Sequence, residues 1–401
     1  MSLVPIDAAL AKILTGVKPI GAEEVPLSNA HGRVLAVPLK AARAQPPFAA
    51  SAMDGYAVRA SDVAKVPTTL KLIGEAPAGH GFPDRVSKGQ AVRIFTGAPL
   101  PAGTDTIIIQ ENTRANDDGT VSILETAAAS SFVRAAGLDF RKGEVLLPKH
   151  TLMGAREIGL AAAMNHARIS VIRRPSVALL ATGDELVEPG ATPRDDQIIS
   201  SNTLAISAII SRFGGEPLDL GIIPDKSTRI EKAIERAAGA DILVTIGGAS
   251  VGDHDLVQAA MEACGIRIGF WKIAMRPGKP LMFGSRQNQR VIGLPGNPVS
   301  AMVCTRLFIV PLIAAMTGNR QPLAPVTGVL GAPMQPNDHR QDYVRATLSH
   351  GKHGEPVATP FPKQDSSMQR IFANADCLII RPPLAPAAKQ GDTIQLQMLD
   401  F

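Results

Sequence analysis

Residues 242–255 read ILVTIGGASVGDHD, in which five apolar or β-favouring residues pass directly into a turn of glycines, serine and acids. Three other short apolar runs end in the same way, at 177–181, 218–223 and 291–294. Segments with helical spacing separate them, at 203–210, 227–238, 255–263 and 299–315. This alternation predicts βαβ units on a mostly parallel sheet, so we expect a central α/β domain with ligands at the carboxyl ends of its strands.

The flanking segments predict a multidomain chain of α/β plus β type. Residues 1–45 and 145–174 show helical spacing and are expected to form one linker domain. Between them, residues 46–144 contain short alternating runs with Gly and Pro turns, which predict an inserted β domain. The α/β domain then covers 175–323, and the return of period-two alternation predicts a small β domain at 324–401.

Composition narrows the class of protein. The chain has 401 residues, 45% hydrophobic and 19% charged, which is typical of a soluble globular enzyme. A net charge of +5 without long charge runs favours small anionic ligands over nucleic acid, and 4% aromatic residues supply few base-stacking side chains. The apolar stretch 299–316 contains Arg306 and Pro311, so we expect a buried helix rather than a membrane span.

Other sequence features predict a cytoplasmic location. The first residues carry an early acid and no secretion signal. The three cysteines are odd in number and widely spaced, which predicts reduced thiols.

The loops that follow the predicted strands carry the candidate site. Asp184 and Glu185 follow the first strand, and Asp225 follows the second; each is either a helix cap or a magnesium ligand. Gly247 and Gly248 allow a tight turn whose N–H groups can hold phosphate. Ser250 and Asp255, in the same loop, can form hydrogen bonds or help hold a metal ion.

A cationic segment, KIAMRPGKP at 272–280, contributes Lys272, Arg276 and Lys279. It is either a solvated basic patch or the group that neutralises an anion. The inserted β domain adds polar residues at turns, among them Asp54, Thr96 and Asp139. Acids on one domain and cations on another suggest a composite site for an anion and a divalent metal ion.

Common motifs offer one alternative. The P-loop, the dinucleotide fingerprint and the zinc-protease motif are absent from the sequence. Gly248-Ala-Ser250-Val-Gly252 matches the nucleophile elbow of serine hydrolases, with Asp338 or Asp342 and His350 as conceivable partners. That interpretation leaves the cations of 272–280 without a role.

Six motifs taken together resemble one family. SAMDGYAV (51–58), TGAPLPAGTD (96–105), ATGDELVEPG (181–190), TIGGASVGDHD (245–255), FWKIAMRPGKPLMFG (270–284) and GLPGNPVSA (293–301) are similar, in order and spacing, to the molybdopterin molybdenumtransferases, which include the gephyrin E domain. The resemblance implies a four-domain homodimer with a molybdopterin-binding α/β domain and a C-terminal β barrel. It also implies that molybdate and adenylylated molybdopterin are the substrates, that Mg²⁺ assists, and that AMP is released.

In that family the cleft lies between the α/β domain of one subunit and the inserted β domain of the other. The resemblance therefore implies roles for matching positions here. The residues it implies as catalytic are Asp54, Thr96, Asp139, Glu185, Asp225, Asp255, Lys272 and Lys279, of which Glu185, Asp225 and Asp255 would hold the metal ion. The residues it implies as substrate-binding are Gly247, Gly248, Ser250, Arg276, Pro280, Pro298, Arg345, Ser366 and Ser367.

This chain departs from the family pattern in three places. Ala49 and Ala50 stand where relatives often have Asp-Asn, Arg276 stands where some have Lys, and 364–371 lacks the usual glycines. Two other functions stay open: a gephyrin-like scaffold, and the related molybdopterin adenylyltransferase, which shares the α/β domain alone. Contacts with that adenylyltransferase and with molybdoenzymes are further expectations, whereas nucleic acid and membrane are not expected partners.

Overall fold

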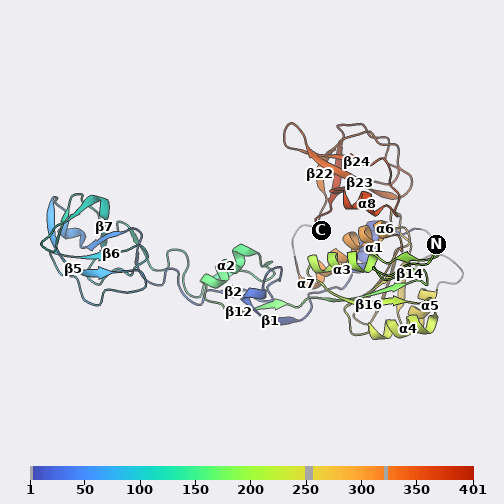
Figure 1. Ribbon diagram of the computed structural model, residues 1–401, viewed down its shortest axis with the longest axis horizontal. Helices are drawn as coiled ribbons and strands as arrows, with labels where there is room; N and C mark the ends of the chain where they lie inside the picture. Colours follow the sequence, from blue (N-terminus) through green and yellow to red (C-terminus); the bar gives the residue numbers. More distant parts are fainter. Residues whose placement is uncertain (1–2, 249–255, 320–323) are drawn as a thin grey trace.

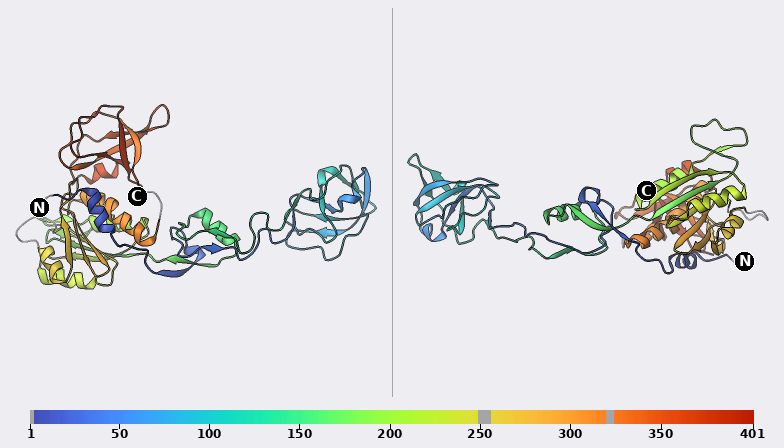
Figure 2. Two further views of the ribbon diagram at one scale, coloured as in Figure 1. Left: turned by 180° about the vertical axis from the view of Figure 1, so that it is seen from behind. Right: turned by 90° about the horizontal axis from the view of Figure 1, so that it is seen from below.

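The computed structural model describes residues 3–248, 256–319 and 324–401 of the chain. The molecule is elongated (Figure 1). An α/β body lies at one end with a small β barrel stacked on it, and a separate β lobe lies at the other end (Figures 1 and 2). A thin connection of paired strands joins the two ends. The observed fold therefore has the multidomain α/β plus β character that the sequence predicts.

The body is built on a six-stranded sheet of order β16-β13-β17-β21-β20-β18. Its strands are β13 (Ser176–Thr182), β16 (Glu216–Ile223), β17 (Ile242–Ile246), β18 (Arg267–Trp271), β20 (Met282–Arg286) and β21 (Gln289–Leu294). β13 runs parallel to β16 and β17, and β17 parallel to β21. The other two strands add antiparallel, so the sheet is mostly parallel as predicted.

Helices cover both faces of this sheet, which is why its central strands are apolar throughout rather than alternating. All five residues of β17 are buried. The helices are α1 (Ile6–Leu14), α3 (Asn202–Arg212), α4 (Ser227–Arg236), α5 (Leu256–Ala263), α6 (Pro298–Cys304) and α7 (Val310–Thr317). One core packs α1, α3, α6 and α7 against one face, and a second packs α4 and α5 against the other.

The apolar stretch at 298–317 forms a continuous core segment. A π-helical turn, η4 (Thr305–Ile309), joins α6 to α7. Among the described residues, Pro298–Thr317 is the one helical stretch long and apolar enough to cross a membrane, and 72% of an 18-residue window within it is buried inside the protein. Arg306 pairs with Asp400 at 3.0 Å within this packing. The stretch is therefore a core helix, as the sequence predicts.

The chain passes twice through the connection between body and lobe. β1 (Ala22–Pro26) pairs with β12 (Arg168–Ile172), and β2 (Leu39–Lys40) pairs with β11 (Val145–Leu147). Helix α2 (Ala155–Ala163) packs beside these strands. Short elements along the way are η1 (Leu27–Asn29) and the pair β3 (Ala50–Ser51) with β10 (Val133–Arg134).

The lobe is a second six-stranded sheet, of order β7-β4-β6-β5-β9-β8. Its elements are β4 (Gly55–Val58), η2 (Ala60–Asp62), β5 (Thr68–Ala76), β6 (Gln90–Ile94), β7 (Thr106–Ile109), η3 (Gln110–Asn112), β8 (Thr113–Ala115) and β9 (Thr120–Ile123). Two small apolar clusters stabilise it.

The C-terminal segment closes into a five-strand barrel. Its elements are β22 (Val326–Leu330), β23 (Gln341–His350), β24 (Pro356–Pro360), α8 (Gln369–Ala373), β25 (Cys377–Arg381) and β26 (Thr393–Met398). β23 pairs with both β24 and β25, which completes the ring. A strand of the body, β19 (Met275–Arg276), adds to β23, so the barrel is tied directly to the body.

All three cysteines are free thiols: Cys304 and Cys377 are buried, and Cys264 is half-buried. This agrees with the expectation of reduced cysteines.

Candidate functional site

A cavity of about 620 Å³ lies at the carboxyl ends of the parallel strands of the body. This is the edge at which the topology of an open α/β sheet places ligands. The predicted site residues that line it are Glu185, Asp225, Gly247, Gly248, Lys272, Lys279, Pro280 and Pro298. Ser250 and Asp255 lie outside the described residues. Ser250 is also the serine of the hydrolase interpretation.

The floor of the cavity is formed by Gly247 and Gly248, which follow β17. Both have positive φ, +88° and +64°. A Cβ atom on Gly247 would lie 2.8 Å from the carbonyl oxygen of Thr182, and one on Gly248 would collide with the side chain of Val257 on α5. Only glycine therefore fits at either position, because both the backbone conformation and the space exclude a side chain.

The cationic wall is formed by Lys272 and Lys279. Lys272 has a φ of +75°, which is unusual for a residue with a Cβ atom. Backbone hydrogen bonds hold it there: its N–H donates to the carbonyl of Leu281 at 3.0 Å, and its carbonyl accepts from the N–H of Val4 at 3.3 Å. Across the described ranges, neither lysine forms an ion pair. Both charges are therefore available to an anionic ligand.

The acidic wall is formed by Glu185 and Asp225, with Asp184 beside them. The backbone N–H of Asp225 donates to Asp184 Oδ1 at 3.2 Å. Desolvation raises the pKa of Asp225, and the nearby charges of Asp184 and Glu185 raise it further. Like-charged oxygens that disfavour one another's ionisation are suited to a divalent cation, which would relieve the repulsion.

The predicted metal set was Glu185, Asp225 and Asp255, and the last of these is outside the described residues. Within the described ranges, no group of three or more His, Cys, Asp or Glu side chains is placed to hold a metal ion. The two described acids therefore form part of a candidate site, and their role as metal ligands stays a prediction.

The C-terminal domain closes one side of the cavity through residues that the sequence analysis did not identify as site residues. Gln369, at the start of α8, lines the cavity and donates from Nε2 to Ser201 Oγ at 2.6 Å. Beyond this contact a second hollow of about 490 Å³ continues between the two domains, lined partly by Asn202 and Phe372. Only its position in the structure identifies Gln369 as a site residue, because the sequence around it matches no known functional motif.

The sequence analysis also did not identify an apolar part of the cavity lining. This part comes from the short parallel pair β14 (Leu186–Val187) and β15 (Ile198–Ile199). Ile198 is 59% exposed and Ile199 is 41% exposed, and both line the cavity. Two adjacent exposed isoleucines in a polar loop were the available signal.

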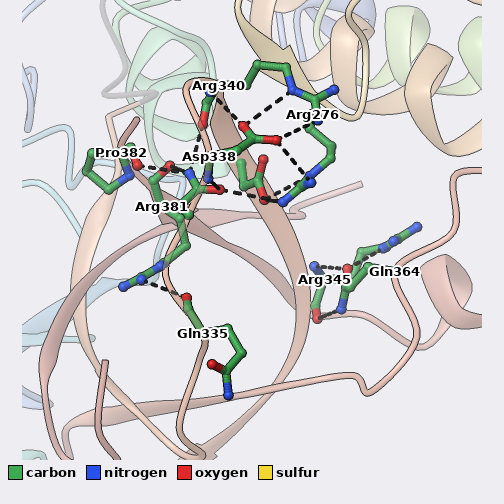
Figure 3. A network of polar contacts seen from close by, with 10 residues as sticks. Arg276, Gln335, Asp338, Arg340, Arg345, Gln364, Arg381 and Pro382 are labelled. Carbon is green, nitrogen blue, oxygen red and sulfur yellow. Dashed lines mark hydrogen bonds and ion pairs between the residues drawn. The ribbon is translucent and has the colours of Figure 1, made fainter. Parts of the chain in front are cut away.

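The structure places Arg276 away from the cavity lining. Its Nε donates to Asp342 Oδ2 at 2.9 Å, and its Nη1 lies 3.4 Å from Asp338 Oδ2 (Figure 3). Arg340 also binds Asp338 and holds the pKa of that carboxyl well below its usual range. Arg276 thus joins β19 to the barrel, because the barrel's carboxylates already satisfy its guanidinium group.

Arg345 lies on β23 and is 1% exposed. Its Nε donates to Gln364 Oε1 at 2.8 Å (Figure 3). Its Nη1 donates to the carbonyl of Asp365 at 2.7 Å. It therefore holds the loop that carries Ser366 and Ser367. Ser366 Oγ accepts from Asn297 Nδ2 at 2.9 Å, next to the cavity, whereas Ser367 Oγ donates to Asp365 at 2.6 Å.

Asp54 and Thr96 are brought together in the distant lobe. Asp54 Oδ1 accepts from the Thr96 N–H at 2.7 Å and from its hydroxyl at 2.8 Å. These bonds lower the pKa of Asp54, so it is ionised at neutral pH. Asp139 is exposed nearer the connection, where its N–H donates to the carbonyl of Gln45. Within one chain this lobe and the α/β body that contains the cavity lie at opposite ends of the molecule (Figure 2).

Comparison with known proteins matches each part of this architecture. Residues 4–165 match the MoeA N-terminal region (domains I and II), 178–315 match the probable molybdopterin binding domain, and 327–399 match the MoeA C-terminal region (domain IV). Molybdopterin molybdenumtransferase of Haemophilus influenzae is 34% identical over 98% of both chains. The protein of that name from Bacillus subtilis is 32% identical over 99% of this chain and 94% of its own length.

Solved structures agree. Two structures of molybdopterin biosynthesis moeA protein from Pyrococcus horikoshii have TM-scores of 0.86 and 0.82 at 29% and 26% identity. They cover 100% and 99% of this chain and 100% of their own.

Proposed function

The chain belongs to the molybdopterin molybdenumtransferase family, transferases of molybdenum cofactor biosynthesis, and on that premise we propose that it inserts molybdate into adenylylated molybdopterin with Mg²⁺ and releases AMP. One observation carries the proposal: a single cavity is lined by a glycine turn, two carboxylates and two lysines that form no ion pair with any described residue. The matches across both β domains favour this function over the adenylyltransferase alternative, which the α/β domain alone would satisfy.

The cationic wall suits the anions of this reaction. Molybdate is a tetrahedral dianion, and the adenylylated substrate carries an anionic phosphate linkage. Lys272 and Lys279 supply charge, and the Gly247–Gly248 turn lets the backbone approach the ligand closely. Donors fixed before the substrate arrives need little reorganisation, which is how such sites lower the free energy of charged transition states.

The acidic wall suits the proposed Mg²⁺. Glu185 and Asp225 would hold the ion, since hard carboxylate oxygens are its preferred protein ligands. When bound, Mg²⁺ supplies charge stabilisation to the phosphate anhydride that is cleaved. The part that this chain plays is to place these two carboxylates in the same cavity as the lysines.

A second subunit completes the proposed site. Asp54 and Thr96 flank β4 and β6 of the lobe, and Asp139 follows the lobe in the chain. The lobe lies at the opposite end of the molecule from the body that contains the cavity (Figure 2). In a homodimer with the chains arranged so that each lobe meets the other body, an ionised Asp54 would face the partner's cavity. A closed two-fold assembly forms two such sites.

Cytoplasmic location belongs to the same proposal, as do contacts with the adenylyltransferase that makes the substrate and the enzymes that take up the cofactor.

The deciding assay incubates the purified chain with adenylylated molybdopterin, Mg²⁺ and molybdate and measures AMP and molybdenum cofactor together. We expect both products in equal amounts from the wild-type chain. Lys279→Ala should lower both at least about a hundredfold. Lys149→Ala changes an exposed lysine of the connection and should leave both unchanged. A folded wild-type chain that forms neither product would contradict the proposed function. If the chain were only a scaffold, Lys279→Ala would not change the amount of either product.

A further inference from the structure

We propose that the hydroxyl group of Thr182 binds a phosphate oxygen of the adenylylated substrate, an inference that rests on the proposed function. Thr182 is the last residue of β13, is 3% exposed and lines the cavity. Its Oγ1 atom is buried and has no hydrogen-bond partner among the described residues. A buried hydroxyl without a partner is uncommon in folded proteins, because losing water without a replacement is unfavourable.

The glycine turn leaves this hydroxyl uncovered. A Cβ atom on Gly248 would lie 3.2 Å from Thr182 Oγ1, and one on Gly247 would lie 3.5 Å from it. Side chains at these two positions would shield the hydroxyl from the cavity. Their absence leaves a neutral donor in the same cavity as the two lysines and the two carboxylates.

Thr245 provides an internal comparison. Thr245 lies on β17, directly opposite Leu180 of β13. It is 1% exposed, and its Oγ1 also has no hydrogen-bond partner within the described part of the chain. Thr245, however, is not among the residues that line the cavity. Both threonine hydroxyls lack a partner among the described residues, and the two residues differ in that only Thr182 lines the cavity.

A phosphate oxygen is the acceptor that this position favours. The hydroxyl shares the cavity with Lys272 and Lys279, whose charges attract an anion. A hydroxyl group can donate to an anionic oxygen without adding charge, and it can turn to suit the ligand. Together with the lysines and the glycine turn it gives the phosphate a set of converging donors.

The test compares Thr182→Val with Thr245→Val, two isosteric changes that each delete a buried hydroxyl with no partner among the described residues. We expect Thr182→Val to raise KM for adenylylated molybdopterin about tenfold, the loss of one hydrogen bond, with kcat little changed. Thr182→Ser keeps the hydroxyl and should restore the wild-type KM. Thr245→Val should change neither constant. Thr182→Ala serves as a second hydroxyl-free variant, and thermal unfolding verifies that every variant is folded.

Binding is measured independently of turnover. Trp271 is the one tryptophan of the chain and directly precedes Lys272, so its fluorescence reports on adenylylated molybdopterin added without molybdate. Weaker binding by Thr182→Val than by Thr245→Val supports the proposal. Equal binding by the two variants overturns it, even if the wild-type chain transfers molybdenum. A wild-type chain that binds this substrate but transfers no molybdenum counts against the proposed function instead.

Discussion

Two aspartates at opposite ends of the molecule are held in opposite ways. Asp54, in the lobe, accepts two hydrogen bonds from Thr96, and its pKa is lowered. Asp225, in the cavity of the body, is partly desolvated beside Asp184 and Glu185, and its pKa is raised. The lobe therefore presents a carboxylate whose charge is already stabilised. The cavity presents a carboxylate whose negative charge is disfavoured by its surroundings, and a bound cation would relieve that penalty.

The largest expected effect tests whether these two regions act together across subunits. Asp54→Ala and Lys279→Ala should each lower molybdenum transfer at least about a hundredfold, as expected for groups that contact the reacting atoms. If one lobe serves the other chain's cavity, dimers that contain one of each variant regain one intact site. Unfolding and refolding an equal mixture should then recover about a quarter of the wild-type rate.

The control for this mixture is each variant refolded alone, which should stay inactive. No recovery in the mixture, with mixed dimers shown to form, would mean that the lobe and the cavity do not share a site across subunits.

The next effect concerns the glycine turn at the cavity floor. Gly248→Ala should lower the free energy of unfolding by about 2–4 kcal/mol, since it combines a left-handed backbone with a collision against Val257. Gly265, just beyond the other end of α5, has a similar φ of +75° with nothing within 4 Å of a Cβ atom. Gly265→Ala should therefore cost only about 1–2 kcal/mol. Urea unfolding measures both, and equal losses would mean that the contact with Val257 is unimportant.

The contact between body and barrel should have a smaller effect. Gln369→Ala removes the hydrogen bond to Ser201 and should raise KM about two- to tenfold, because the wall of the cavity is then less well fixed. Asn374→Ala, in the same segment but without a place in the cavity lining, is the control. If Gln369→Ala matches this control in steady-state kinetics, the contact stabilises only the domain arrangement.

The smallest effect distinguishes the two aspartates by pH. A raised pKa in the folded state makes ionised Asp225 unfavourable, so its cost is absent below the ordinary value of 3.8 and grows as the pH rises above it. Asp225→Asn should raise the melting temperature at pH 7 by about 2 °C or less. Asp54 has the opposite sign, since its lowered pKa gives stability that is lost as the pH falls.

Asp54→Asn should therefore lower the melting temperature at pH 7. Scanning calorimetry at pH 7 and pH 3 measures both variants, and both differences should shrink in acid. If both substitutions changed the melting temperature at pH 7 in the same direction, the opposite pKa shifts of Asp54 and Asp225 would be contradicted.

The fold was largely predictable because each strand of the body is a separate apolar run. Val177–Ala181 and Ile242–Ile246 are buried on both faces and are bounded by polar loops, so their type and limits follow from local pattern. The antiparallel addition of β18 and β20 was not predicted. Their residues alternate weakly, and their place at the sheet edge depends on packing against α5 and β21.

The candidate site was predictable where a motif coincides with a strand end. Lys272, Lys279, Glu185 and Asp225 follow strands and do line one cavity. Arg276 belongs to the same motif as the lysines but binds the carboxylates of Asp342 and Asp338 in the barrel. Nothing in the local sequence distinguishes these outcomes, since the partner carboxylates lie more than sixty residues away along the chain.

The sequence by itself determined the succession of strands, helices and turns, and with it the edge of the sheet where a ligand belongs, because backbone conformation and apolar periodicity are local properties. Only the tertiary structure decided that carboxylates of the barrel neutralise Arg276, and that the Thr182 hydroxyl lies beside a glycine turn with no hydrogen-bond partner among the described residues. It also placed the lobe at the far end of the molecule from the body that contains the cavity (Figure 2). Burial, pairing and distance depend on segments that meet only when the chain folds, so no local pattern encodes them.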